Sequence, residues 1–146
     1  MKALNKFTMT MDSRSANEGF ARLVASGFAA QLDPTVEELC DIKTAVSEAV
    51  TNCIVHAYPD GVGNIYISAG IFGNGLVRIK IRDKGCGIAD IKKAMEPLYS
   101  SLGGERAGLG FAVMESFCDK ISVRSTPGKG TAVTLDKYIK GKEFGG

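Results

Sequence analysis

Apolar and polar residues follow two different periodicities along this chain. Strict alternation, which is typical of a strand with one buried face, occurs over residues 7–11, 65–71, 77–81, 121–125 and 131–135. Between the first two of these stretches, the apolar positions recur every three or four residues, which is the spacing of an amphipathic helix. The pattern therefore predicts five strands and a long helical region that follows the first of them.

The first helix of that region is expected to begin near residue 13 and to run to about Gln31. Asp12 or Ser13 would cap its N-terminus. Asp33-Pro34 would end it, because proline cannot continue a helix. The residues that we expect this helix to bury are Phe20, Leu23, Val24, Phe28 and Ala29.

A second helix is expected to start just after Thr35 and to continue to about His56. Thr35 and Glu38 have the spacing of a capping box, in which each residue satisfies a backbone N–H group of the other. Turns are predicted at Gly73-Asn74-Gly75 and Pro127–Gly130, where the glycines and the asparagine tolerate positive φ.

The remaining pattern predicts a hairpin, a short helix at 89–95, a mobile loop at 96–107, a helix at 108–118 and a second hairpin. This order of elements favours a two-layer α/β sandwich with helices on one face of a mixed sheet. We expect one domain over residues 1–140 and a disordered tail at 141–146.

The chain has 146 residues, and its 18 lysines and arginines against 16 aspartates and glutamates give a net charge of +2. So small an overall charge makes no electrostatic case for nucleic acid, and we expect no direct nucleic acid partner. The four cysteines form no C-x-x-C pair, which argues against a zinc site and favours a reducing compartment. Neither a signal peptide nor a membrane-spanning run is recognisable, so we expect a cytoplasmic protein without a membrane partner.

Glu48 and Asn52 stand four residues apart within the second predicted helix and therefore on one face of it. A carboxylate can act as a general base, and a carboxamide oxygen can bind a hard cation such as Mg²⁺. Phosphoryl transfer uses both groups together. Such a pair is also typical of a solvated helix face, so the spacing alone leaves both interpretations open.

Asp83 ends a predicted strand and is followed by Gly85 and Gly87. A buried carboxylate there could accept a hydrogen bond from an exocyclic amine, and the glycines would let the backbone approach a flat ring. An ordinary turn is the competing interpretation. A dinucleotide-binding fold is a further alternative, but the third glycine of its motif is missing and the surrounding strands form hairpins.

Arg106, Gly108 and Gly110 stand at the start of the helix predicted over 108–118. Free backbone N–H groups and the positive end of a helix favour phosphate, and Arg106 would add a forked donor. A P-loop is excluded because Leu109 replaces the lysine that it requires. Close packing at the helix start is the alternative explanation of the glycines.

Three further residues have no decisive context in the sequence. Thr131 begins a strand, where a β-branched residue is common. Arg22 lies on the first helix, where a solvated face explains it equally well. His56 ends the second helix, where a histidine usually complements the helix dipole.

Taken in order, these motifs resemble the GHKL family of ATPases and kinases. The segments similar to its N-box, D-x-G-x-G box, second glycine box and last glycine box are Glu48–Asn52, Asp83–Gly87, Arg106–Gly110 and Gly128–Thr131. The similarity to the anti-sigma serine kinases of this family covers nearly the whole chain and rests also on Phe20–Arg22, Gln31–Thr35, Ser47–Asn52 and Glu105–Phe111.

The resemblance implies the two-layer Bergerat fold with ATP and Mg²⁺ as cofactors. By matched position, it implies that Glu48 is the catalytic base, that Asn52 binds Mg²⁺ and that Asp83 accepts from the adenine amine. The positions that it matches to nucleotide binding are Asn52, Asp83, Gly85, Gly87, Arg106, Gly108, Gly110 and Thr131. Among these, the arginine and its neighbouring glycines would hold phosphates, and the threonine would support the adenine site.

The resemblance also implies a homodimer that inhibits a sporulation sigma factor of the sigma-F type and phosphorylates an anti-anti-sigma factor on serine. Arg22 would face the sigma factor. The alternatives are a stress-response anti-sigma kinase, a nucleotide-binding anti-sigma switch without efficient kinase activity, and the detached ATPase domain of a histidine kinase. Glu48 argues against the nucleotide-binding switch, because a protein that only binds nucleotide needs no catalytic base. The lack of a preceding helix with a phospho-accepting histidine argues against the histidine kinase domain. The lid over Leu98–Arg106 is short for the family.

Overall fold

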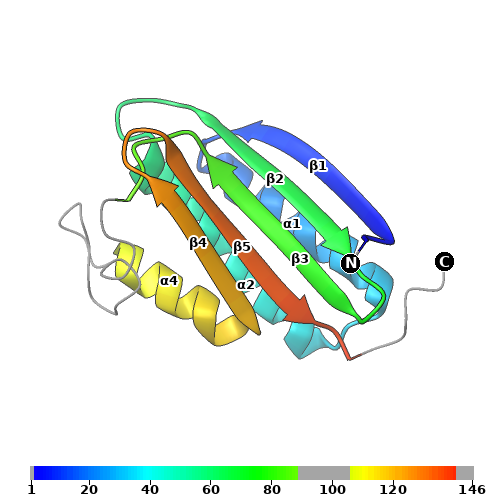
Figure 1. Cartoon of the computed structure of the whole chain (residues 1–146). Helices are drawn as coiled ribbons and strands as arrows, with labels where there is room; N and C mark the ends of the chain where they lie inside the picture. Colours follow the sequence, from blue (N-terminus) through cyan, green and yellow to red (C-terminus); the bar gives the residue numbers. More distant parts are fainter. Residues whose placement is uncertain (1, 89–105, 141–146) are drawn as a thin grey trace.

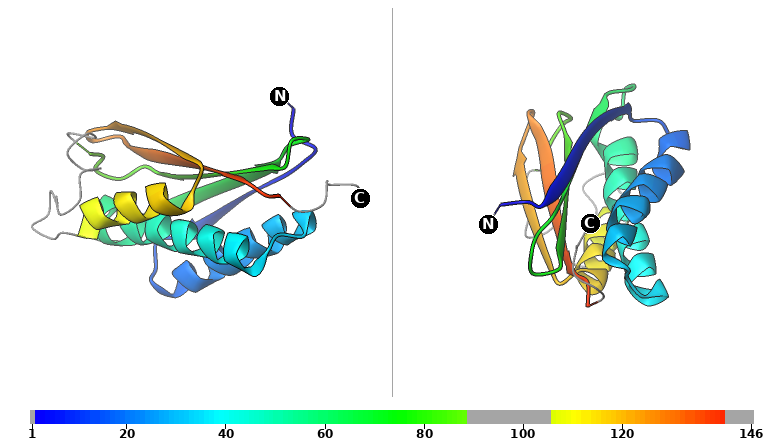
Figure 2. Two further views of the ribbon diagram at one scale, coloured as in Figure 1. Left: turned by 90° about the horizontal axis from the view of Figure 1, so that it is seen from below. Right: turned by 90° about the vertical axis from the view of Figure 1, so that its right-hand side faces the viewer.

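The computed structural model describes residues 2–88 and 106–140, which form two layers (Figure 1). A five-stranded sheet is one layer, and the helices all lie on a single face of it (Figure 2). The strands are β1 (Asn5–Asp12), β2 (Asn64–Ile71), β3 (Leu76–Asp83), β4 (Lys120–Thr126) and β5 (Gly130–Tyr138). The helices are α1 (Ala16–Ala29), α2 (Val36–Asn52) and α4 (Arg106–Phe117), with a 3₁₀ turn at Ala30–Leu32 and a π-helical turn at Cys53–Ala57. The predicted two-layer α/β sandwich is confirmed.

The strand order is β1-β2-β3-β5-β4, and every neighbouring pair is antiparallel. The expectation of a mixed sheet therefore needs correction. Two helices return the chain to the end of the sheet where β1 stops, so β2 runs against β1. Helix α4 crosses once, which gives β4 the direction of β3, but β5 lies between these two strands (Figure 1).

The two ends of the sheet carry different parts of the chain. Asn5 pairs with Ile71 and Tyr138 pairs with Leu76, so the start of β1 and the finish of β5 lie at the same end. Asp83, the last residue of β3, lies at the other end, where β5 begins.

Alternation along each strand decides which side chains enter the core. In β3, Val77, Ile79 and Ile81 are buried against the helices, whereas Arg78 and Lys80 are exposed on the opposite face. The same arrangement in the other strands leaves one face of the sheet without any of the described helices over it (Figure 2). The core thus lies entirely between the sheet and the helix layer.

Helix α1 starts later than the sequence predicts. Its N-cap position is Ser15, and Asp12 still pairs with Asn64 in the sheet. The Ser13 hydroxyl accepts a hydrogen bond from the N–H of Gly63 at 2.9 Å instead of capping the helix. Asp12 thus belongs to β1, and Ser13 connects the end of β1 to the loop before β2, so neither residue caps α1.

Helix α1 buries only part of the face that the sequence predicts: Phe28 and Ala29 are buried as predicted, and Val24 is partly buried. The buried side chains are mostly small: Ala21, Ala25, Ser26, Phe28 and Ala29. Phe20 and Leu23, which were expected in the core, are 51% and 68% exposed. The alanines recur at four-residue spacing, and a stripe of small side chains allows α1 to approach α2 closely, so the bulky residues point away.

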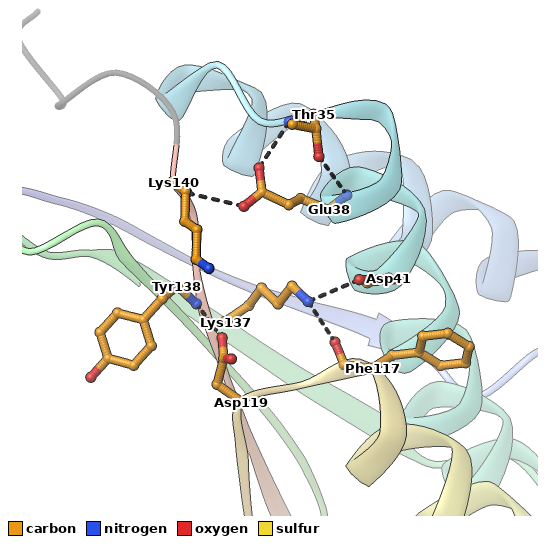
Figure 3. A network of polar contacts seen from close by, with 8 residues as sticks. All are labelled: Thr35, Glu38, Asp41, Phe117, Asp119, Lys137, Tyr138 and Lys140. Carbon is orange, nitrogen blue, oxygen red and sulfur yellow. Dashed lines mark hydrogen bonds and ion pairs between the residues drawn. The ribbon is translucent and has the colours of Figure 1, made fainter.

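Helix α2 begins as predicted, and its first turn is tied to the far end of the chain (Figure 3). Thr35 and Glu38 form the complete capping box, with hydrogen bonds of 2.9 and 3.0 Å. The second carboxylate oxygen of Glu38 accepts from the N–H of Lys140 at 3.0 Å. Nearby, the Lys137 ammonium donates to Asp41 at 2.9 Å and to the carbonyl of Phe117 at 3.1 Å, which joins β5 to α2 and α4.

Several predicted features can be compared only in part. The helix at 89–95, most of the loop at 96–107 and the tail at 141–146 lie outside the described residues. The helix predicted over 108–118 is confirmed as α4, which starts two residues earlier. Within the described part of the chain, no helix is long and apolar enough to span a membrane.

The capping box makes the stability of the fold depend on pH in a defined direction. Burial alone would raise the pKa of Glu38, but hydrogen bonds from Thr35 and from the N–H of Lys140 lower it below its ordinary value of 4.5. A carboxylate whose pKa is lowered by folding stabilises the protein above its unfolded pKa, and this contribution is lost as the pH falls through the folded pKa.

We therefore expect Glu38→Gln to destabilise the protein near neutral pH and to lose that effect in acid. Thr35→Ala should lower the free energy of unfolding by about 1 kcal/mol. Urea unfolding at several pH values between about 7 and 3 measures both effects. Glu37→Gln is the matched control, because Glu37 is an exposed neighbour in the same helical turn. An equal, pH-independent loss in both glutamine variants would contradict this account.

Candidate functional site

A cavity of about 70 Å³ lies where the C-terminal end of α2, the end of β3 and the start of β5 meet α4. Its lining residues are Ala49, Asn52, Cys53, His56, Ala57, Ile81, Asp83, Cys86, Gly87, Ile88, Phe111, Thr131 and Val133. Four of the predicted site residues, Asn52, Asp83, Gly87 and Thr131, are therefore brought together from separate segments. Apolar walls with a few converging polar groups are typical of a small-molecule site.

Asp83 is the central polar group of this cavity and is only 6% exposed. Its Oδ1 accepts hydrogen bonds from the N–H groups of Gly85 at 2.9 Å and Thr131 at 3.2 Å. Its Oδ2 accepts from the thiol of Cys53 at 3.5 Å. A carboxylate has about four acceptor sites, so Oδ2 retains capacity for one more donor from the cavity.

Cys53 is a site residue that the sequence did not reveal. Burial, together with the negative charge of Asp83, raises the pKa of its thiol well above the ordinary value, so the thiol stays protonated and donates. Helical spacing placed Cys53 in the core, which is correct, but its partner lies 30 residues away in the chain. No local pattern could have indicated that contact.

Asn52 is the last residue of α2, and Glu48 lies one turn earlier on the same helix. The side-chain Oδ1 and Nδ2 of Asn52 are buried and have no hydrogen-bond partner among the described residues. Leaving such a group unpaired costs about 1–3 kcal/mol, so the amide fits a ligand that would complete it. Glu48 is half-buried beside this position and does not itself line the cavity.

The donor chemistry of Asn52 suits Mg²⁺, which prefers oxygen ligands. Within residues 2–88 and 106–140, no group of three or more histidine, cysteine, aspartate or glutamate side chains could hold a metal. Mg²⁺ commonly binds through one or two protein oxygens together with substrate phosphates and water. The residues present therefore fit a magnesium ion that arrives with a phosphorylated ligand.

The glycines of the site allow protein segments to approach one another. A Cβ at Gly85 would collide with the carbonyl oxygen of Ala57, and one at Gly130 would collide with that of Asp83. Gly87 has φ +75°, and a Cβ there would collide with the carbonyl oxygen of Thr126. The sequence suggested close approach to a flat ring, whereas the described contacts are between backbone and backbone.

Tyr58 holds the loop after β3 against the end of the second helix. Its hydroxyl accepts from the N–H of Lys84 and donates to the carbonyl of Asn64, both at 2.7 Å. The π-helical turn precedes it directly, and such turns are frequent at functional sites. The sequence predicted an uninterrupted helix to about His56, so it missed this irregular end.

Ser125 is another site residue without a signal in the sequence. Its hydroxyl accepts from the N–H of Ile88 at 2.7 Å and lies 2.8 Å from the hydroxyl of Thr131. Because Thr131 also donates its N–H to Asp83, this pair connects β4 to the cavity wall. The backbone N–H of Thr131 therefore helps to hold the carboxylate of Asp83 in position.

The other predicted site residues lie apart from this cavity or beyond what can be described. Arg106, Gly108 and Gly110 belong to the first turns of α4, and their side-chain environment lies outside the described part. Of the lid predicted over Leu98–Arg106, residues 98–105 also lie outside it. Arg22 is on α1, where its guanidinium lies 3.3 Å from the hydroxyl of Ser47 and 3.4 Å from the carboxylate of Glu18.

Comparison with known proteins agrees with this fold. The family model described as "Histidine kinase-like ATPase domain" matches residues 11–137. A protein of Thermoanaerobacter sp. (strain X514) named anti-sigma F factor is 56% identical over 140 residues, which cover 95% of this chain and 97% of that protein. The anti-sigma F factor of Pasteuria penetrans is 47% identical over 93% of this chain and 92% of its own length.

Solved structures show the same fold at lower identity. The RsbU and RsbW domains of a Mycobacterium tuberculosis protein superpose with a TM-score of 0.69 at 21% identity, covering 97% of this chain and 35% of that one. A histidine kinase domain from Erythrobacter litoralis superposes with a TM-score of 0.56 at 20% identity over 84% of this chain and 61% of that chain.

We expect Gly87→Ala to lower the free energy of unfolding by about 1–3 kcal/mol, because a residue with a Cβ is strained at this φ. The collision with Thr126 adds to that cost. Gly61→Ala is the matched control, since nothing lies within 4 Å of a Cβ placed there. Thermal or urea unfolding measures the difference, and equal stability of the two variants would show that the loop after β3 tolerates displacement.

Proposed function

Because this chain belongs to the family of histidine kinase-like ATPase domains, we propose that its cavity binds ATP and that it acts as an anti-sigma factor with serine kinase activity. One observation carries the proposal. Asp83, with free acceptor capacity on Oδ2, and Asn52, with an unpaired buried amide, face the same cavity. The first group suits an adenine amine and the second suits the metal of a nucleotide.

Adenine recognition is assigned to Asp83. Its carboxylate is fixed by backbone donors from Gly85 and Thr131 on one oxygen, so the other keeps a defined direction. An adenine amine would donate to that oxygen, whereas guanine presents an acceptor at the corresponding position. Phosphates are assigned to Arg106, Gly108 and Gly110 at the start of α4, where backbone N–H groups of a helix are unpaired.

Asn52 is assigned to Mg²⁺ and Glu48 to proton transfer. When bound, Mg²⁺ would neutralise charge on the triphosphate. Glu48 lies one helical turn before Asn52, and this spacing supports a role for its carboxylate in accepting the proton of an incoming serine hydroxyl. Placing both groups on one helix fixes their separation regardless of loop movements.

The relatives named anti-sigma F factor support a sigma factor as a partner of this chain. We propose a sporulation sigma factor of the sigma-F type, which the chain binds and inhibits, and an anti-anti-sigma factor as the substrate for phosphorylation. Helix α1 suits partner contact, because Phe20 and Leu23 expose apolar surface on either side of Arg22 in the sequence. Exposed large apolar side chains often mark interaction sites, and arginine is enriched among the residues that dominate binding.

A homodimer in the cytoplasm is part of the same proposal. Among the described strands, β1 pairs only with β2, so its other edge is available to a second chain. A two-fold axis at that edge would bring two copies of α1 near one partner. The four free cysteines support a reducing compartment.

Glu48→Gln should retain ATP binding and lose about 10²–10⁴-fold of the rate of phosphoryl transfer to the anti-anti-sigma protein. Transfer from labelled ATP and nucleotide titration measure the two properties separately. Glu115→Gln, which changes an exposed carboxylate on α4, is the control. Transfer at the unchanged rate in Glu48→Gln would remove the base assignment, and no transfer in the unmodified protein would favour a nucleotide-binding switch.

Arg22→Glu should weaken binding of the sigma factor at least about tenfold without changing ATP affinity or dimer mass, since a forked donor is replaced by a repelling charge. Arg14→Glu, an exposed arginine just before α1, is the matched control. Pull-down with the sigma factor and light scattering provide the readouts. A monomer at micromolar concentration would disprove the dimer, and equal capture by both variants would remove Arg22 from the contact.

A further inference from the structure

The sheet face without helices carries an unusual concentration of positive charge. The side chains on it that bear charge are Lys6, Asp12, Arg78, Lys80, Arg82, Lys84, Lys120, Arg124 and Asp136. Seven cations against two anions give this face a charge of +5, while the rest of the chain has eleven cations against fourteen anions and a charge of −3. We call this surface the basic face; it is turned toward the viewer in Figure 1.

Five of the seven cations of the basic face form two rows with a gap between them. Arg78, Lys80 and Arg82 repeat at every second position of β3, and Lys120 and Arg124 lie on β4. Strand β5 runs between these rows, which places the two strands about 9.6 Å apart at the usual strand spacing. The floor of the gap is formed by Ala132 and Thr134 of β5 with Ser122 beside them on β4, and at one end by Asp136 of β5, whose carboxylate is paired with Arg78.

This gap belongs to a hollow of about 590 Å³ that extends across the sheet to β1. Lys6, Lys80, Lys120 and Arg124 line it, and their side chains make no ion pair or side-chain hydrogen bond within the described residues. Among the described cations that line the hollow, Arg78 differs, because its guanidinium donates to both carboxylate oxygens of Asp136 at 2.8 and 3.0 Å. Unpaired like charges repel one another, so folding gains nothing from gathering them here.

We propose that the basic face binds a nucleic acid strand through its phosphates, with the strand lying along β5 between the two rows of cations. Lysine, arginine, serine and threonine side chains are the usual partners of phosphate oxygens. Contacts of this kind read no bases, so binding would not depend on sequence. A small net charge for the whole chain argued against nucleic acid, but the position of the charges on one face outweighs their sum.

Other occupants fit the basic face less well. A protein interface normally has an apolar or aromatic centre and few lysines, whereas Tyr66 is covered by Arg82 and Lys84, and Phe72 by Arg78. A second copy of this chain would bring +5 against +5. A membrane surface is flat, and the cations line a hollow.

The test is fluorescence anisotropy with labelled oligonucleotides of about 20 nucleotides, as single-stranded DNA, single-stranded RNA and duplex DNA. We expect binding at about 50 mM salt, a loss of about two orders of magnitude in affinity by 200 mM, and similar affinity for two unrelated sequences. Lys80→Gln/Lys120→Gln removes one cation from each row. It should weaken binding at least about tenfold and reduce the salt slope by about 1.4, which corresponds to two phosphate contacts of 0.7 each.

Lys43→Gln/Lys140→Gln is the matched control, because it removes the same charge from α2 and from the chain beyond β5. ATP affinity should be unchanged in both double variants, which separates this proposal from that for the nucleotide site. Absence of binding at about 50 mM salt, or equal weakening in both double variants, would overturn the proposal. Binding of a polyglutamate peptide but of no oligonucleotide would also overturn it, and would assign the basic face to an acidic protein.

Discussion

Burial of only one face of the sheet is the constraint on which the rest of this structure depends. The inward residues of β3, such as Val77, Ile79 and Ile81, have a single place to pack, which is the layer formed by α1, α2 and α4. The helices must therefore lie side by side on that face, and the ends of α2, β3 and β5 converge at one end of the sandwich. The cavity is a consequence of this convergence, and so is the freedom of the opposite face to carry charge.

The sequence predicted the elements well because their signals are local. Alternation identified all five strands, and Thr35 with Glu38 identified the start of α2 within a residue. The failures arose where a tertiary contact decides the outcome. Phe20 and Leu23 have the right spacing for a buried face, but the alanine stripe on the other side of α1 packs more closely.

The candidate site shows the same limit more sharply. Its motif residues Asn52, Asp83 and Thr131 could be named from the sequence, and the fold brings them to one cavity. The contacts that hold Asp83 in place could not, because Cys53 and Thr131 are 30 and 48 residues away from it. Net charge has a related limit: it sums over the whole chain, whereas the strands gather seven cations and two anions on one face of the sheet.

The arrangement of the two ends of the sheet has a consequence for how this domain can be used. The start of β1 and the finish of β5 lie together, and the cavity lies at the opposite end. A tether or a fused domain joined directly before β1 or after β5 would thus leave from the end of the sheet opposite the cavity. Surface attachment through an end, or insertion of the fold into a longer polypeptide, would leave ligand access unobstructed.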